Sequence, residues 1–411
     1  MVDEITIRTI EDSEVAAFRD AMATVFAFDP KEEDLEIFRG WVELDRSMAA
    51  VDDGRIVATG GAVTFQMVVP GGSLVGAAGL TMITVQPTHR RRGLLRRMIE
   101  RHFDDAAARG EPVSILWASE SSIYGRFGYG VAVEARDLTI ARSDGRLRSD
   151  VPGARGHVRL HDADEARPIV EKIYRMASVE AGIPGSLVRR NADWDGYFDD
   201  PEHRRKGATR LHFAIYHVEG EARGYVRYRL KSSWSAAGPD GTVMVHDLQA
   251  LDGDAYAALW RYLFSIDLMV KIEVHNRRPA EAVYRLLADP RRVESAGYDA
   301  IWVRILDVPT ALASRRYSVD GSLVFDVIDD MRPGSGGRFR LEGGPDGASC
   351  EPTDAAADIQ VPVEHLGAAY LGVPHLAELR WLGMVEGDRN ALRLADAMFR
   401  WSPPPHTSVH F

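Results

Sequence analysis

An arginine-rich turn is the part of this sequence whose residue types point most directly to chemistry. It follows an apolar run at residues 80–85, contains Pro87 and Gly93, and has arginine at five of the eight positions 90–97. Apolar residues then recur at helical spacing, at Leu94, Leu95, Met98, Ile99 and Phe103. The pattern predicts a strand that turns tightly into a helix. Because the free N–H groups and positive dipole end of a helix attract anions, the turn predicts a site for a phosphorylated cofactor.

Length and charge bound the class of protein. The chain has 411 residues, enough for two or three domains, and a hydrophobic content of 45%, which is typical of an ordinary globular protein. Its formal net charge is −11. This acidic balance argues against nonspecific nucleic-acid binding, which needs a basic footprint. It is compatible with cationic substrates, because a negative field raises their local concentration.

Targeting and redox signals are few. No apolar run is long enough to cross a bilayer, and the acidic first residues have no signal-peptide pattern. Cys350 is the single cysteine, which excludes an intramolecular disulfide. It lies in a Gly/Pro/Asp-rich region without a catalytic-cysteine motif. A lone cysteine fits a reducing compartment, so the predicted location is the cytoplasm.

Apolar periodicity predicts a mixed α/β unit in the first 145 residues. The predicted helices are residues 12–28, 30–44, 94–108 and 121–127. The predicted strands are residues 47–52, 55–69, 74–85, 113–118 and 131–141. Residues 142–156 are rich in Gly, Pro, Ser and charge, which is typical of a domain boundary.

The order of elements partly repeats after this boundary, which indicates an internal duplication. The second copy has predicted helices at residues 162–177, 254–264 and 279–288. Where the arginine turn would fall, residues 251–256 read Leu-Asp-Gly-Asp-Ala-Tyr, which is acidic. We therefore expect the second copy to bind no phosphorylated cofactor. A third, α+β region with Gly-rich turns begins near residue 308, and a stiff triproline precedes the last residues.

The arginine turn resembles the acetyl-CoA pyrophosphate loop of GNAT acetyltransferases. The family pattern is Arg/Gln-x-x-Gly-x-Gly/Ala, and residues 90–95 read Arg-Arg-Arg-Gly-Leu-Leu, which departs only at the last position. A second GNAT signature, Tyr-x-x-x-Gly-Phe/Tyr, is matched by residues 124–129, which read Tyr-Gly-Arg-Phe-Gly-Tyr. The two motifs stand in the βαβ order of a GNAT fold.

Longer stretches are similar to the enhanced intracellular survival (Eis) family of GNAT N-acetyltransferases. They are Pro-Thr-His-Arg-Arg-Arg-Gly-Leu-Leu-Arg from Pro87, Ala-Ser-Glu from Ala118 and Ile-Tyr-Gly-Arg-Phe-Gly-Tyr-Gly from Ile123. Leucine at the last loop position is usual in that family. The resemblance covers essentially the whole chain. It implies an α/β (α+β) protein with two tandem GNAT folds, each a mixed sheet with flanking helices, and a C-terminal sterol-carrier-protein-like domain.

The resemblance further implies an activity and a domain plan. It places a catalytic, acetyl-CoA-binding GNAT domain at residues 1–145 and a GNAT-like domain without cofactor at 146–307. Residues 308–411 would form the sterol-carrier-protein-like domain, which supplies the C-terminal carboxylate. Family members form homohexamers and transfer acetyl directly to amines of aminoglycosides and some lysine side chains. The expected acceptor is therefore a small, polycationic, aminoglycoside-like amine.

Two alternatives to this activity remain open. The first is a different acceptor, a protein lysine or a polyamine. The second belongs to another class of protein, a lipid- or sterol-binding carrier with an apolar tunnel through residues 323–371.

The cofactor-binding residues follow from the motif positions. In the family, the strand before the loop lays its backbone along the pantetheine arm, and backbone N–H groups of the loop hold the pyrophosphate. The matching residues are Ile83, Thr84, Val85, Arg90, Arg91, Arg92, Gly93, Leu94, Leu95 and Arg96. Ser119 and Glu120 follow the next strand, where the splayed strands would admit the cofactor arm.

Tyr124 and Phe411 match the family's acid and base. A tyrosine has a pKa of about 10 and a thiol about 8.5, so Tyr124 need only hydrogen-bond the leaving sulfur and deliver a proton late. The family's base is its C-terminal carboxylate, here Phe411. With a pKa of about 3.5, this carboxylate is expected to orient the amine, relay its proton through water and stabilise the developing cation. His410 stands where the family often has an acid, and it could relay a proton near neutral pH.

Acceptor-binding candidates lie on the first two predicted helices, on the strand edge and in the last residues. They are Phe26, Phe28, Asp29, Phe38, Met82 and His410. Asp29 is the acidic group best placed to bind a polycation. Other chemistries are not indicated, because the histidines lack metal-ligand spacing and neither a nucleophile elbow nor a P-loop lysine appears. We therefore expect no metal.

Overall fold

The computed structural model describes residues 5–411, which divide into two compact units. One unit comprises the chain up to Val133 together with Leu187–Asp193 and Asp299–Phe411. The other comprises Glu134–Ser186 and Trp194–Tyr298. Each unit is therefore built from segments that lie far apart in the sequence.

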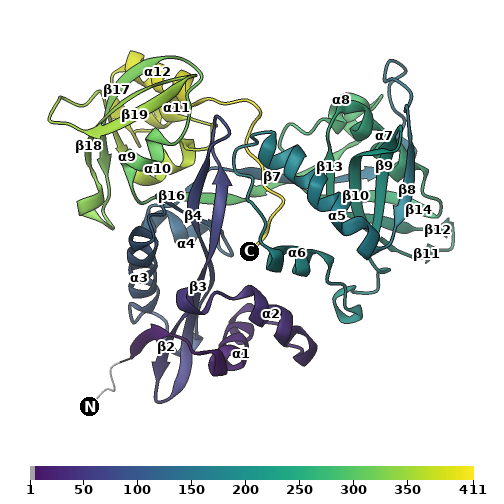
Figure 1. Cartoon of the computed structure of the whole chain (residues 1–411), viewed down its shortest axis with the longest axis horizontal. Helices are drawn as coiled ribbons and strands as arrows, with labels where there is room; N and C mark the ends of the chain where they lie inside the picture. Colours follow the sequence, from purple (N-terminus) through teal and green to yellow (C-terminus); the bar gives the residue numbers. More distant parts are fainter. Residues whose placement is uncertain (1–4) are drawn as a thin grey trace. The chain divides into compact units, whose positions relative to one another are not determined.

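A seven-stranded mixed sheet in the first unit positions the candidate site (Figure 1). Its order is β1-β2-β3-β4-β5-β16-β6, and β4 and β5 are its parallel neighbours. The other neighbours pair antiparallel. The strands are β1 (Thr6–Thr9), β2 (Met48–Asp52), β3 (Arg55–Val68), β4 (Leu74–Val85), β5 (Val113–Trp117), β6 (Gly130–Val131) and β16 (Ile301–Ile305).

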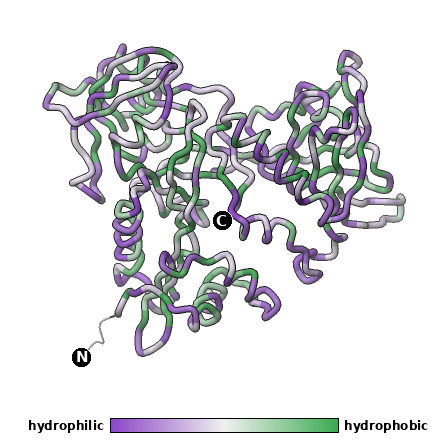
Figure 2. The backbone as a smooth tube through the Cα atoms, viewed as in Figure 1, coloured by the Kyte–Doolittle hydropathy of each residue, from purple (hydrophilic) through white to green (hydrophobic). Residues whose placement is uncertain are grey.

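Helices cover both faces of this sheet because successive strand residues point to opposite sides. On β2, Ala49 packs in a cluster with residues of α1, whereas its neighbours Met48 and Ala50 pack with Leu94 and Met98 of α3. Figure 2 shows the hydrophilic residues that α3 carries along its length beside this apolar stripe. The helices are α1 (Val15–Phe26), α2 (Leu35–Trp41), α3 (Leu94–Ala108) and α4 (Ser121–Tyr124).

Each of the two seven-stranded sheets contains one strand that is remote in sequence from most of its other strands: β7 (Glu134–Ala141) lies in the second sheet and β16 in the first. The single strand predicted at residues 131–141 is wrong, because it is divided into β6 in the first sheet and β7 in the second. Conversely, β16 follows the second repeat and pairs with β5. Apolar periodicity predicts that a segment is a strand, but it does not say which sheet offers the partner. The compact units are not continuous in sequence and do not test the domain boundaries predicted at residues 145 and 307, which stay predictions.

The second unit repeats the arrangement of the first around its own parallel pair. Its sheet has the order β15-β7-β14-β13-β10-β9-β8, and β13 and β14 run parallel. Helix α7 (Gly253–Ser265) follows β13 as α3 follows β4. The other strands and helices are β8 (His157–His161), β9 (His212–Val218), β10 (Glu221–Lys231), β11 (Trp234–Ser235), β12 (Gly238–Pro239), β13 (Gly241–Ala250), β14 (Met269–Arg277), β15 (Glu294–Asp299), α5 (Ala163–Tyr174), α6 (Asn191–Phe198) and α8 (Val283–Leu286). The helix predicted at 279–288 shortens to α8, because Leu287 is extended and bridges to Leu147.

The C-terminal part of the first unit is a five-stranded sheet with four helices. Its strand order is β19-β18-β17-β20-β21. The elements are α9 (Val308–Ala313), β17 (Gly321–Ile328), β18 (Gly337–Gly344), β19 (Gly347–Pro352), β20 (Ile359–Pro362), α10 (Val363–Ala369), α11 (Leu376–Trp381), β21 (Glu386–Gly387) and α12 (Arg389–Phe399). A buried ion pair between Arg304 of β16 and Asp329, 2.5 Å apart, joins this part to the first sheet.

We expect Cys350 to resist thiol reagents in the folded protein. The residue lies in β19 at 7% exposure, and burial raises the pKa of its thiol to about 12. Because only the thiolate is nucleophilic, alkylation by iodoacetamide at pH 7.5 should be far slower than for the guanidinium-unfolded chain. Equal rates in the folded and unfolded protein would contradict the burial.

Candidate active site

The first sheet opens between its parallel strands. Pairing of β4 with β5 runs from Ala77 opposite Val113 to Gly79 opposite Ile115 and then stops. Beyond this point β4 continues along β3 to Val85, and β5 continues along β16 to Trp117. The two strands therefore part while each stays held by its outer neighbour, which leaves an entrance in the middle of the sheet.

A bulge in β4 lies beside this entrance. The register with β3 shifts between the pairs Thr59–Thr84 and Gly61–Thr81, and Met82 has a positive φ of 55°. A bulge leaves one residue outside the ladder, so its carbonyl needs another partner. The Thr59 hydroxyl donates to the Met82 carbonyl at 2.7 Å and also contacts the Thr84 hydroxyl at 2.6 Å. The bulge therefore leaves Met82 and Ile83 between the two registered pairs, next to the entrance.

The predicted anion loop has the backbone of an anion-binding turn. Arg91 and Gly93 both have positive φ, 62° and 77°, and Gly93 caps α3 without a side chain. No N-cap side chain therefore accepts from the first N–H groups of α3, which face the turn with the positive end of the helix dipole. His89 ties the loop to the end of β2, since its Nε2 lies 2.9 Å from a carboxylate oxygen of Asp52.

A cavity of about 730 Å³ connects the loop with the entrance. It collects most of the predicted cofactor-binding residues: Ile83, Thr84, Val85, Arg90, Arg91, Gly93, Leu94, Leu95, Arg96, Ser119 and Glu120. Arg92 is outside this lining, and its guanidinium lies 3.8 Å from Asp52. A helix N-terminus and three arginine side chains at one end of a partly apolar cavity suit a ligand with a phosphate head and a long arm.

Tyr124, predicted as the acid, lines the same cavity. Its ring is 5% exposed and packs in the core cluster with Phe103 and Tyr129. Burial raises the pKa of Tyr124, a hydrogen bond with Ser119 lowers it, and the charge of Glu120 raises it. The net shift is upward, so the hydroxyl keeps its proton at neutral pH and can donate it.

The last residues dock against the first sheet without forming a helix or strand. Val409 is 5% exposed and Thr407 is 1% exposed. The Phe411 ring packs on Phe65 of β3, with ring centres 4.9 Å apart. A Cβ at Gly79 would lie 3.0 Å from the Phe411 ring, so the absence of a side chain there gives the ring its place. Phe411 therefore lies where β4 and β5 part.

The predicted acceptor-binding residues are distributed over several places. Phe26 lines the cavity, whereas Phe28 is 44% exposed and outside its lining, as is the exposed Asp29. Met82 and Phe38 pack in the core cluster under α1. His410 stacks on Trp117, with ring centres 3.7 Å apart.

Several residues of the site were not predicted from the sequence. Val25, His89, Ile123, Arg126 and Phe127 line the cavity. Arg126 and Phe127 lie within the tyrosine signature and Ile123 directly precedes it, so this motif marks all three residues. Trp117 and Phe65 contact the tail through pairings that are distant in sequence, and no local pattern marks them.

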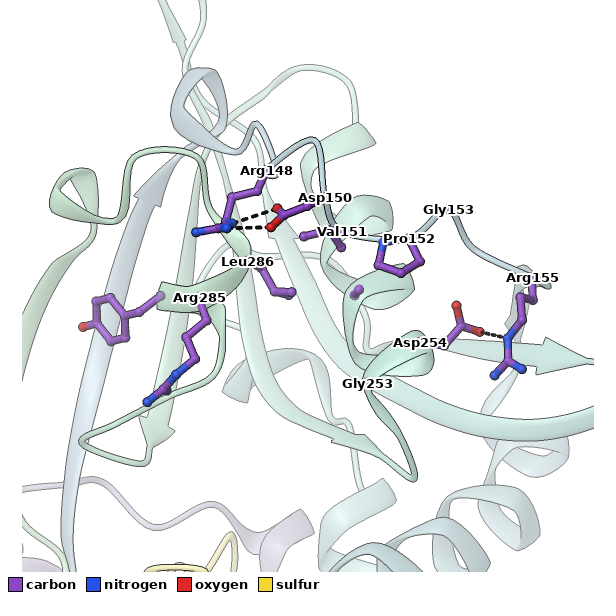
Figure 3. A pocket seen from close by; sticks show the side chains of 12 residues that line it. Arg148, Asp150, Val151, Pro152, Gly153, Arg155, Gly253, Asp254, Arg285 and Leu286 are labelled. Carbon is purple, nitrogen blue, oxygen red and sulfur yellow. Dashed lines mark hydrogen bonds and ion pairs between the residues drawn. The ribbon is translucent and has the colours of Figure 1, made fainter.

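The second unit has a different arrangement at the equivalent helix start. Asp252 caps α7 by accepting from the Ala255 N–H, and Arg223 pairs with Asp252 at 2.7 Å. The N-terminus of α7 thus already faces a carboxylate of its own chain. A cavity of about 850 Å³ lies nearby. Two of its three arginines, Arg148 and Arg155, pair with Asp150 and Asp254, and the third is Arg285 (Figure 3). These contacts agree with the expectation that this unit takes no phosphorylated cofactor, which stays a prediction.

Among residues 5–411, no group of three or more His, Cys, Asp or Glu side chains is arranged to hold a metal ion. Within the same range, no helix is both long enough and apolar enough to span a membrane.

Gly93→Ala is expected to weaken cofactor binding without unfolding the protein. No atom lies within 4 Å of a Cβ built at Gly93, so only the left-handed backbone opposes a side chain. We expect the strained loop to relax in the free protein, so cofactor binding must restore its conformation. At a cost of roughly 1–2 kcal/mol, this corresponds to a rise in KM for acetyl-CoA of about 5- to 30-fold. Gly153→Ala is the matched control, because Gly153 also has open space and no positive φ. An unchanged KM in Gly93→Ala would contradict the role of the loop.

The parallel pair that parts beyond Gly79, the bulge in β4 and the loop before α3 define the class of protein, a GNAT-type acyltransferase. Residues 6–132 and 185–305 each match an acetyltransferase (GNAT) domain family, and residues 308–408 match the sterol carrier protein domain family. The predicted fold of two tandem GNAT domains with a sterol-carrier-protein-like domain is confirmed.

Relatives narrow the class to a family. The chain is 36% identical to the N-acetyltransferase Eis of Mycobacterium tuberculosis over 355 residues, 84% of this chain and 83% of that protein. It is 42% identical to an uncharacterized N-acetyltransferase of Streptomyces avermitilis over 356 residues, 86% of each. Eis1 from Mycobacterium abscessus is similar in structure, with a TM-score of 0.84, 30% identity and coverage of 99% of this chain and 100% of the other. The chain belongs to the Eis family of GNAT N-acetyltransferases.

Membership in this family makes the protein an N-acetyltransferase, as the sequence predicts. Its GNAT domains imply acetyl-CoA as the cosubstrate. The residues around the first cavity fit such a molecule, because the loop and α3 offer N–H groups to a pyrophosphate and Ile83–Val85 offer strand backbone to an extended arm.

Proposed function

We propose that this protein transfers acetyl from acetyl-CoA directly to a primary amine of a small, aminoglycoside-like polycation. Arg90–Arg96 and the strand Ile83–Val85 would bind the cosubstrate, with Ser119 and Glu120 beside its arm. The amine nitrogen bonds to the acetyl carbon, the carbon–sulfur bond breaks, and the amine loses a proton.

Two groups of the chain would move protons in this reaction. The Tyr124 hydroxyl donates a hydrogen bond to the departing sulfur and then its proton. The Phe411 carboxylate orients the amine, stabilises its positive charge and passes its proton on through water. His410 stands beside this carboxylate in sequence and is the second candidate for the relay.

The observation that carries this proposal is the meeting of three features in the first unit. The loop before α3 and Tyr124 line a single cavity, and Phe411 lies where β4 and β5 part. Phe411 is not among the residues that line the cavity, so its carboxylate would act from the entrance between the two strands. The acidic net charge of −11 also favours an amine acceptor, because a negative field raises the local concentration of cations.

Few carboxylates near the site are available to bind a positively charged acceptor. Glu43 and Asp193 lie near Phe65, but Arg190 pairs with both, at 2.6 and 2.8 Å, and its guanidinium lies 5.7 Å from the Phe65 ring centre. Binding of a polycation would therefore rest on Asp29, Glu120 and the Phe411 carboxylate. A panel of acceptors that differ in charge separates aminoglycosides from the open alternatives, a polyamine or a protein lysine.

A lipid-carrier function is less well supported by the interior of the C-terminal part. A tunnel wide enough for a lipid chain also admits water, which would leave accessible surface on its walls. Phe325, Leu366 and Leu371 are each 0% exposed. Because none of these three side chains faces such a tunnel, we favour the transferase role for the whole chain.

The test is release of CoA from acetyl-CoA in the presence of a kanamycin-type aminoglycoside, spermidine or a lysine peptide. Turnover with the aminoglycoside, with kcat/KM above that for spermidine and the peptide, is the expected result. Turnover only with the peptide or spermidine would shift the acceptor to that class. Tight acetyl-CoA binding without turnover of any amine would contradict the proposed reaction.

We further propose that the protein assembles as a homohexamer and works in the cytoplasm. Both proposals come from the family resemblance and from the single cysteine. Sedimentation velocity of the purified protein at micromolar concentration tests the assembly, and a monomer under those conditions would contradict it.

A further inference from the structure

Trp117 stands at the entrance between β4 and β5 and is held there by the sheet. It is the last residue of β5, two positions beyond the last pair with β4, and it pairs with Ile301 of β16. The ladder on the β16 side therefore sets the position of its backbone. The predicted cofactor residues Ser119 and Glu120 follow it directly along the chain.

The side chain of Trp117 contacts the tail, which we define as residues 408–411, in two ways. Its indole Nε1–H donates to the Val409 carbonyl at 3.0 Å. Its ring stacks on His410, with centres 3.7 Å apart and planes inclined by 22°. One contact fixes the tail backbone and the other fixes the side chain next to Phe411.

Arg189 contacts the tail from the neighbouring segment. Its guanidinium donates to the Ser408 carbonyl at 3.2 Å and to the Ser408 hydroxyl at 3.3 Å. The segment that carries Arg189 is tied to β3, because the Val188 N–H donates to the Gln66 carbonyl at 2.9 Å. Arg189 and Trp117 thus hold consecutive tail residues from β3 and from β5, the strands on either side of β4.

We propose that Trp117 and Arg189 are positioning residues that hold the Phe411 carboxylate at the entrance, an inference that rests on the proposed function. Residues 117–124 also connect the proposed acid with the residues that contact the proposed base. Trp117 sets the tail, and Ser119, two residues on, hydrogen-bonds with Tyr124. A single stretch of chain therefore sets the place of both the proposed acid and the proposed base.

Variants of both residues separate positioning from general loss of structure. Trp117→Ala and Arg189→Met are expected to lower kcat about tenfold or more, because each removes one or two hydrogen bonds to the tail, while KM for acetyl-CoA stays near wild type. The conservative Trp117→Phe keeps a ring that stacks on His410 and should recover part of the loss. Trp381→Ala is the matched control, because Trp381 is 82% exposed and makes none of the tail contacts described above.

Carboxypeptidase digestion reads the position of the tail directly. Release of Phe411 should be faster in Trp117→Ala and Arg189→Met than in the wild type or Trp381→Ala, at equal thermal midpoints. Faster release with lower kcat supports the proposal. Unchanged release overturns it, and so does faster release with unchanged kcat. A protein whose tail is extended past Phe411 serves as the separate check, since full activity of that variant would remove the carboxylate from the proposed function itself.

Discussion

Tyr124→Phe is expected to lower kcat by about 10²- to 10⁴-fold, the range for loss of a general acid. The substitution removes only a hydroxyl from a ring that is 5% exposed, so the core around Phe103 and Tyr129 keeps its packing. KM for acetyl-CoA should change little, because we propose that the loop and strand backbone bind the cosubstrate. Stopped assays of CoA release, with thermal unfolding as a check on the fold, measure both quantities.

The pH profile gives this prediction a second readout. An acid acts only while protonated, and burial raises the pKa of Tyr124 above its usual value near 10. The rate should therefore not fall through loss of this proton until the pH exceeds the ordinary tyrosine range. Ser119→Ala removes the hydrogen bond that lowers this pKa, so its basic limb should move to higher pH. A Tyr124→Phe enzyme with wild-type kcat would exclude the hydroxyl as the acid.

Extension of the chain by two alanines after Phe411 is expected to lower kcat by about 10²-fold or more. The extension replaces a carboxylate by a neutral amide and moves the charge away from the place where β4 and β5 part. A preorganised charge that stabilises a developing cation is typically worth about 10²–10³ in rate. CoA release with saturating acetyl-CoA, measured against amine concentration, gives kcat and KM for the acceptor.

A matched variant separates the carboxylate from the ring of Phe411. Phe411→Leu keeps the terminal charge but loses the ring that packs on Phe65, so it should retain more activity than the extended chain. Added formate should restore part of the rate of the extended chain if a free carboxylate is what it lacks. Equal kcat in the extended and wild-type proteins would show that the carboxylate takes no part.

The residues predicted to bind the cofactor lie together in the structure, and their role in binding it stays a prediction. Of the predicted loop and strand residues, all but Arg92 line the cavity. They are adjacent along the chain, and a strand–turn–helix with a glycine of positive φ forms from local preferences. The turn sequence therefore carries its own geometry, and only the direction of each arginine depended on neighbours such as Asp52.

The residues predicted to bind the acceptor do not gather in one place, because they come from separate elements. Phe38 and Met82 belong to the core under α1, and helical apolar spacing cannot distinguish a residue that faces a core from one that faces a ligand. Phe28 follows the left-handed cap Ala27 at the end of α1, and its ring is 44% exposed, as is that of Phe26 within the helix.

By itself the sequence determined the anion loop, the tyrosine signature, the repeated α/β pattern and, through resemblance, the family. Each depends on contacts within a few residues or on motifs that read directly. The tertiary structure alone decided that β16 enters the first sheet, at which residue the expected separation of β4 and β5 begins, and that Trp117 and Arg189 contact the tail. The partners of the Trp117–Val409 contact are 292 residues apart. No local pattern specifies such a contact, because it forms only after folding has brought β5 and the last residues together.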